Sequence, residues 1–182
     1  MRTRLLMLAL LFALLAPGPW AHVAAAPTAT AEPTDSTTTV ILVRHAEKDT
    51  VLLGSDPPLS AAGIVRAREL ARVLGQVKIS AIYVTPWQRT RQTAQPLATR
   101  LGDTLTVVDA IDETVERLRT RHHGQIVLVV GHSNTVPQII ERLTGQPVPP
   151  YTEGEYDPLY VVTLVPGRRA RVVRLHYGAG RP

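Results

Sequence analysis

Two segments of the chain decide its fold: Val40-Ile41-Leu42-Val43-Arg44-His45-Ala46-Glu47 and Ile126-Val127-Leu128-Val129-Val130-Gly131-His132-Ser133-Asn134. Each begins as a run of apolar, mostly β-branched residues, which predicts a buried strand, and each run ends at a histidine. In open α/β folds the chemistry lies at the carboxyl ends of the strands. We therefore expect both imidazoles to lie at the same edge of one sheet.

Arginines accompany these histidines. Arg44 directly precedes His45, and Arg89 and Arg91 follow another short apolar run at residues 81–84. Taken alone, either histidine is more often an ordinary polar residue at the start of a loop. Two imidazoles and two guanidinium groups with few acids beside them favour a site for a doubly charged anion such as phosphate.

Four motifs, in this order, resemble those of the histidine phosphatase superfamily, the phosphoglycerate mutase-like group. Residues 42–48 are similar to the Arg-His-Gly signature, with Ala46 in place of Gly. Residues 58–63 resemble the Pro-Leu-Thr/Ser-x-x-Gly helix entry, and residues 85–94 resemble the segment Ser-Pro-Leu-x-Arg-Ala-x-Gln-Thr-Ala. Residues 130–133 match the Gly-His segment of the second histidine. The resemblance covers residues 40–143 and identifies Arg89, not Arg91, as the second arginine of the site.

The resemblance implies a histidine acid-type phosphatase that hydrolyses small phosphomonoesters through a phosphohistidine intermediate. His45 would be the nucleophile, and Arg44, Arg89 and His132 would bind the phosphate oxygens. No metal and no cofactor are implied, and the sequence has no Asp-rich cluster or His-x-x-x-His pair typical of a metal site. Two alternatives are a phosphohistidine or phosphoprotein phosphatase and a non-catalytic phosphate-binding module.

The proton donor for the leaving oxygen stays open. Relatives often supply a Glu or Asp beyond the third strand or directly after the second histidine, and Ser133 excludes the latter position here. The candidates are Glu47, Asp112 and Glu113. Asp112 could equally cap a helix, and Glu113 could equally lie in its first turn.

The first 26 residues have the layout of a secretory signal peptide. Arg2 and Arg4 precede an apolar run at residues 5–15, and small residues follow at 24–26. The run is too short for a stable membrane anchor, which needs about 20 apolar residues. Residues 27–38, rich in Thr, Ala and Pro, predict a flexible linker. We therefore expect an exported protein, periplasmic or extracellular, whose phosphatase domain spans residues 39–182.

Composition limits the possible partners. The chain has 182 residues and no cysteine, which excludes disulfides, thiol catalysis and a lipid anchor on cysteine. Its formal net charge is +5, and loss of Arg2 and Arg4 with the signal peptide would leave about +3. The aromatic content of 4% and the lack of a nucleic-acid-binding motif argue against nucleic acid as a partner.

Strand and helix patterns alternate along the domain. Strands are predicted at 40–43, 81–84, 105–108 and 126–130, followed by a closing β-hairpin at 159–165 and 170–175. Ser60 is expected to cap a helix. Its apolar stripe is expected to contain Ile64, Ala67, Ala71 and Leu74, and its solvated face Arg66, Arg68 and Arg72. A second helix is expected to follow Thr85-Pro86 and run to about residue 101. Further helices are expected at about 112–121 and after a cap at Ser133 or Asn134.

These patterns predict a three-layer α/β/α sandwich on a mostly parallel central sheet, like the phosphoglycerate mutase-like fold. Outside the site, His122 and His123 are expected at a helix end, where they interact favourably with the helix dipole. Residues 153–157 and His176 are expected on the surface, and the alternative is that they line the mouth of the pocket.

Overall fold

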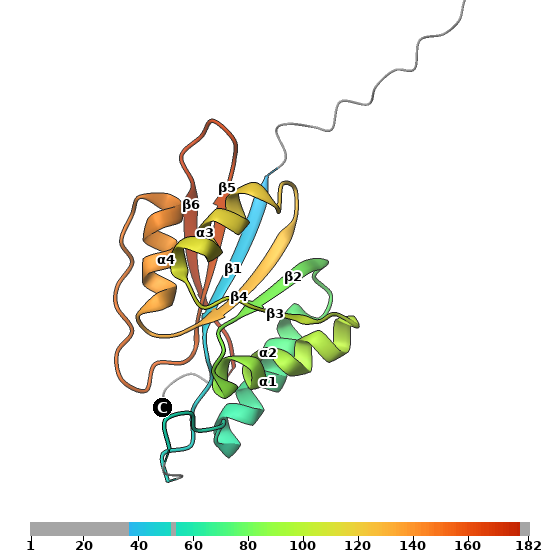
Figure 1. Ribbon diagram of the computed structural model, residues 1–182, viewed down its shortest axis with the longest axis vertical. Helices are drawn as coiled ribbons and strands as arrows, with labels where there is room; N and C mark the ends of the chain where they lie inside the picture. The colour runs from blue at the N-terminus through green and yellow to red at the C-terminus, as the bar shows by residue number, and fades with distance from the viewer. Residues whose placement is uncertain (1–36, 52–53, 179–182) are drawn as a thin grey trace, which may run out of the picture. The chain divides into compact units, whose positions relative to one another are not determined.

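The computed structural model describes residues 37–51 and 54–178 (Figure 1). The expected signal peptide, and the expected linker up to residue 36, lie outside the described residues. Among the residues that are described, no helix combines the length and the apolar character needed to cross a membrane.

The central sheet has six strands in the order β3-β2-β4-β1-β5-β6. Four of them run parallel: β1 (Thr38–Arg44), β2 (Ile79–Val84), β3 (Leu105–Val107) and β4 (Ile126–Gly131). The last two, β5 (Pro158–Leu164) and β6 (Arg171–His176), form the expected antiparallel hairpin at the other edge. The mostly parallel sheet with a C-terminal hairpin is therefore confirmed.

Two helices cover each face of the sheet (Figure 1). One face packs against α1 (Ala61–Leu74) and α2 (Gln88–Leu101), and the other against α3 (Ile111–Thr120) and α4 (Thr135–Thr144). The alternation of side chains along β1 explains this arrangement, because successive residues point to opposite faces. Val40 and Leu42 join the core beneath α3 and α4, whereas Ile41 and Val43 join the core beneath α1 and α2.

Helix α1 begins as expected and buries Ala67, Ala71 and Leu74 of the expected apolar stripe, but not Ile64. Ser60 caps it, since its side chain accepts a hydrogen bond from the backbone N–H of Gly63 at 3.2 Å. Ile64 is 45% exposed, so its place in the expected apolar stripe is wrong. The buried face contains Gly63, Ala67 and Leu70, and Ile64 lies about 100° away around the helix from Gly63.

Gly63 faces the chain just after β1. A Cβ atom at this position would lie 2.1 Å from the backbone oxygen of Glu47, which is closer than real side-chain atoms approach. The glycine therefore lets α1 pack directly against the segment that follows His45, which explains why the buried face is centred on Gly63.

His122 is a structural residue of the core. It is 8% exposed, its Nε2 lies 2.7 Å from the Tyr83 hydroxyl, and its Nδ1 lies 2.7 Å from the side-chain oxygen of Gln125. Its carbonyl also accepts a hydrogen bond from Thr38. The expected dipole contact is therefore wrong for His122, because tertiary partners hold its ring, whereas His123 is exposed as a helix-end residue can be.

Candidate active site

The register of β1 and β4 brings the two histidines together. Arg44 pairs with Gly131 in the parallel ladder, and the backbone N–H of His45 donates to the Gly131 carbonyl at 2.8 Å. The next residue of each segment therefore leaves the sheet at the same edge. The rings of His45 and His132 lie 5.3 Å apart between centroids, in an edge-on arrangement.

All four expected site residues line one pocket of about 420 Å³ at this edge. Arg44 is the last residue of β1 and His45 follows it, Arg89 lies in the first turn of α2, and His132 follows β4. The remaining lining residues are Lys48, Thr85, Trp87, Asp109, Ser133, Asn134 and Thr135. Arg91 is exposed and does not line the pocket, in agreement with the assignment of Arg89 by the motif.

His45 presents an unprotonated nitrogen to this pocket. Its Nδ1 lies 2.7 Å from the carbonyl oxygen of Ala46, and because a carbonyl can only accept, Nδ1 carries the proton. Burial, together with the nearby His132 and Arg44, lowers the pKa of His45 to about 3, and the hydrogen bond to Ala46 opposes this shift. The ring is therefore neutral near pH 7, and Nε2 keeps its lone pair.

Thr93 connects the segment of His45 to α2. Its hydroxyl accepts a hydrogen bond from the backbone N–H of Ala46 at 2.9 Å and donates to the carbonyl of Arg89 at 2.7 Å. Thr93 is fully buried. One hydroxyl therefore sets the spacing between the segment of His45 and the turn that carries Arg89.

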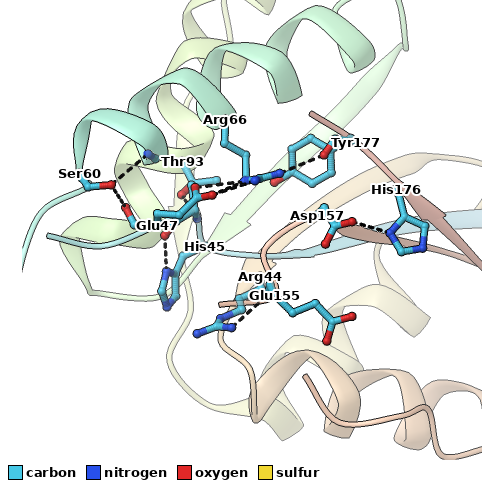
Figure 2. A network of polar contacts seen from close by, with 12 residues as sticks. Arg44, His45, Glu47, Ser60, Arg66, Thr93, Glu155, Asp157, His176 and Tyr177 are labelled. Atoms are coloured by element: carbon cyan, nitrogen blue, oxygen red, sulfur yellow. Dashed lines mark hydrogen bonds and ion pairs between the residues drawn. The ribbon is translucent and has the colours of Figure 1, made fainter. Parts of the chain in front are cut away.

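Arg44 is held by the loop between α4 and β5. Its Nη1 donates to the carbonyl of Glu155 at 2.9 Å, and its guanidinium carbon lies 4.2 Å from the ring centre of Tyr156. Figure 2 shows Arg44 and Glu155 side by side. The Glu155 carboxylate in turn accepts from the backbone N–H of Thr152 and pairs with Arg174.

Residues 153–157 form a surface loop, as expected, and none of them lines the pocket. The loop orients Arg44 through a backbone carbonyl and an aromatic ring, neither of which has a recognisable sequence signal. His176 is exposed as expected, and its Nδ1 pairs with the Asp157 carboxylate at 2.7 Å (Figure 2).

Arg89 is oriented by two side chains. Its Nη1 lies 3.6 Å from the Asp56 carboxylate, and its guanidinium carbon lies 4.6 Å from the ring centre of Trp87. Asp56 also accepts from the backbone N–H of Gln88, the first residue of α2. Asp56 thus fixes the arginine and satisfies an N–H group at the start of its helix.

His132 is the second neutral imidazole of the pocket. Its backbone N–H donates to the Thr135 hydroxyl at 2.8 Å, and its Nε2 lies 2.9 Å from the Thr85 hydroxyl. Burial lowers the pKa of His132 to about 4, with contributions from Arg89 and Arg44, and Asp109 and Asp56 oppose this shift.

None of the three expected proton donors lines the pocket. Both Glu47 oxygens accept from Nε of Arg66, at 2.9 and 3.0 Å, and Arg66 also donates to the Tyr177 carbonyl (Figure 2). The expectation that Arg66 lies on a solvated face is therefore wrong. Asp112 is exposed and pairs with Arg142, and Glu113 pairs with Arg117. Ala110, not Asp112, is the N-cap residue of α3.

Asp109 is the carboxylate that lines the pocket, and sequence reasoning missed it. Its position directly after the third strand was the available signal, because parallel strands end at the functional edge. Within residues 37–51 and 54–178, no group of three or more His, Asp or Glu side chains could hold a metal ion.

Comparison with known proteins finds one matching family model. The model for the histidine phosphatase superfamily (branch 1) matches residues 40–114, which contain the first histidine motif and Arg89. Over these residues the chain is similar to the histidine phosphatase superfamily. A search of curated proteins found no match.

Solved structures share the fold. The protein histidine phosphatase SixA in complex with tungstate is 21% identical, covers 76% of this chain and 96% of its own, and superposes with a TM-score of 0.65. A mycobacterial glucosyl-3-phosphoglycerate phosphatase is 15% identical over 75% of this chain and 97% of its own, with a TM-score of 0.62. YhfR from Bacillus stearothermophilus is 20% identical over 74% and 95%, with a TM-score of 0.62.

Proposed function

We propose that the protein is an exported, metal-independent phosphatase that hydrolyses phosphomonoesters through a phosphohistidine on His45. One observation carries the chemical part of this proposal. The Ala46 carbonyl holds the proton of His45 on Nδ1, so a free Nε2 lone pair faces a pocket that contains Arg44, Arg89 and His132. Export is proposed from the layout of the first 26 residues alone.

In the first step, Nε2 of His45 forms a bond to phosphorus while the bond from phosphorus to the ester oxygen breaks. The negative charge on the phosphoryl oxygens is matched by the two guanidinium groups, whose planar donor sets suit oxygen pairs. Both arginines are held by protein partners before the substrate arrives, which lowers the cost of ordering them.

The leaving oxygen needs a proton, and Asp109 is the pocket carboxyl that can supply it. In the second step, water attacks phosphorus, the bond to Nε2 breaks and its electron pair returns to the ring. The Asp109 carboxylate takes up the proton of that water. The enzyme and inorganic phosphate are then released with both protons accounted for.

Rapid chemical quenching with a labelled phosphate ester tests this function. The wild-type protein should yield an acid-labile, base-stable phosphoenzyme, and His45→Ala should yield none and lose turnover. A chelator should leave the wild-type rate unchanged. Near-wild-type kcat in His45→Ala, or loss of activity on chelation, would contradict the proposal.

A second candidate substrate is a phosphohistidine or other phosphoprotein. The similarity to the fold of the protein histidine phosphatase SixA favours including it. A panel of small phosphate esters and phosphohistidine peptides, compared by kcat/KM, distinguishes the two substrate classes. Phosphate binding without turnover of any ester or peptide would instead support a non-catalytic binding module.

A further inference from the structure

A chain of two buried hydroxyls leads from His132 to the backbone. The Thr85 hydroxyl lies 2.9 Å from His132 Nε2 and 2.9 Å from the Thr90 hydroxyl. The Thr90 hydroxyl lies 3.0 Å from the carbonyl oxygen of Thr85 and 2.9 Å from that of Trp87. Thr90 is fully buried and Thr85 is 8% exposed, so these groups depend on each other for hydrogen bonds.

The carbonyl end of this chain sets its direction. Both carbonyl neighbours of Thr90 can only accept, so the single Thr90 proton goes to one of them. Thr90 must then accept from Thr85, which uses the single Thr85 proton. The Thr85 oxygen can then only accept a hydrogen bond from His132, and therefore Nε2 of His132 is the donor. The neutral ring thus carries its proton on Nε2 and a lone pair on Nδ1.

Nδ1 is the ring nitrogen left for a ligand. No described residue forms a hydrogen bond with it, and His132 lines the phosphate pocket. Thr90 occupies the position where the similar family motif has alanine, so the hydroxyl that fixes this direction is a departure of this chain from the motif.

The charges around His132 keep the ring neutral before a ligand binds. Arg44 from β1 and Arg89 from α2 face it with positive charge, and His45 is neutral beside it. Asp109, after β3, and Asp56, in the loop before α1, act in the opposite direction but do not restore its ordinary pKa. A neutral ring with a bare Nδ1 repels a fully ionised phosphate oxygen and attracts a P–O–H group.

We propose that Thr85 and Thr90 are positioning residues that hold the proton of neutral His132 on Nε2, so that Nδ1 accepts a proton brought by the phosphate group. This rests on the proposed phosphatase site and names its preferred substrate form, the phosphomonoester monoanion. On binding, the O–H bond of the phosphate breaks and an N–H bond forms at Nδ1. The resulting imidazolium donates to the phosphate through Nδ1 and still donates to Thr85 through Nε2.

Nitrogen-15 NMR of the ring tautomers tests the first half of this proposal without any turnover. At pH 7 without ligand, His132 should be in the Nε2–H form in the wild type and in Thr90→Ser, which keeps the hydroxyl. Thr90→Val should show a mixture of both tautomers. Thr114→Val is the matched control, because Thr114 is also buried and its hydroxyl donates to a carbonyl four residues earlier, away from any histidine.

Binding of inorganic phosphate, followed by calorimetry in buffers of different ionisation enthalpy, tests the second half. At pH 8 free phosphate is mainly the dianion, so the wild type, Thr90→Ser and Thr114→Val should take up about one proton per phosphate bound. Thr90→Val should take up less, because its Nδ1–H tautomer donates without gaining a proton. Its kcat/KM should also decline less steeply between pH 6 and 8.

An Nδ1–H or mixed tautomer in the wild type would overturn the proposal, and so would equal proton uptake by the wild type and Thr90→Val. These results are independent of the proposed function. A fixed Nε2–H tautomer with proton uptake but no phosphoenzyme would refute the phosphatase and leave the positioning role intact. Phosphoenzyme formation with a mixed tautomer would refute the positioning role and leave the phosphatase intact.

Discussion

At the scale of single residues, the pocket combines two guanidinium groups with two imidazoles that are neutral because they are buried. Arg44 and Arg89 each have a partner that orients the side chain before a ligand binds. The proposed nucleophile and the positive charges are therefore different residues, and substitutions can separate their effects.

Arg89→Ala should raise KM as well as lower kcat, with a loss of about 2 to 4 kcal/mol in kcat/KM, typical of one preorganised electrostatic donor. Arg89→Lys should recover only part of this loss, because an ammonium cannot reproduce the planar donor set. Arg91→Ala is the matched control, since Arg91 is exposed on the same helix. Steady-state kinetics with one ester checks this, and equal losses in the two alanine variants would show that Arg89 is wrongly assigned.

Acid should destabilise the protein through His45. In the unfolded chain this residue takes up a proton near its ordinary pKa of 6.5, whereas in the folded state burial lowers the pKa to about 3. The unfolded state therefore binds more protons between these values, and stability falls as the pH drops through that window. From pH 7 to pH 5 the expected contribution of His45 is about 2 kcal/mol.

Urea unfolding at both pH values measures this contribution. His45→Asn should lose less stability between pH 7 and pH 5 than the wild type, by about that amount. His123→Asn is the control, because His123 is exposed. Identical pH dependence of wild type and His45→Asn would show that the buried imidazole is not neutral in the folded protein.

At the scale of secondary-structure elements, three segments meet around the Glu47 carboxylate. Arg66 of α1 binds both of its oxygens and also reaches the Tyr177 carbonyl, just after β6 (Figure 2). Gly63 allows α1 to approach the backbone of the same segment. This contact places the start of α1 against the residues that follow His45.

Arg66→Met should therefore destabilise the protein by about 2 kcal/mol, because it leaves a partly buried carboxylate without its partner. Glu47→Gln combined with Arg66→Met should lose less than Arg66→Met alone, since no unpaired charge remains. Arg68→Met, on the exposed side of α1, should change stability very little. Thermal and urea unfolding measure the three variants, and equal losses at Arg66 and Arg68 would contradict the structural role of the pair.

At the scale of the whole molecule, the strand order decides where the chemistry lies. β1 is central in the sheet and pairs with β4 on one side and β5 on the other. β4 therefore delivers His132 to His45, and the loop before β5 delivers Glu155 and Tyr156 to Arg44. The pocket is assembled from distant parts of the chain around one central strand.

The proposed export makes a prediction about the mature chain. Because a charged start, an apolar run and small residues succeed one another, cleavage is expected within residues 25–32. N-terminal sequencing of protein isolated from the native host should find a chain that begins in this range. Intact Met1 on protein from the cytoplasm would contradict export and leave the proposed chemistry untouched.

The strands, the helices and the two histidines at the edge of the sheet could be predicted from the sequence. Apolar periodicity along β1 and β4 is a local property, and the motif at residues 85–94 selected Arg89 over Arg91. Ser60 could be recognised as a helix cap for the same reason, because its partner is three residues away.

The pairing of charged groups could not be predicted, because it depends on how distant elements pack. Glu47 pairs with Arg66, Asp56 with Arg89, and Arg44 with the carbonyl of Glu155, and each partner lies on a different element. Helical periodicity predicted that Arg66 lies on a polar face. Periodicity describes one helix and contains no information about a carboxylate in another loop. Hydrogen-bond direction at His132 likewise depends on β2, α2 and β4 packing together, which fixes distances that no stretch of sequence contains.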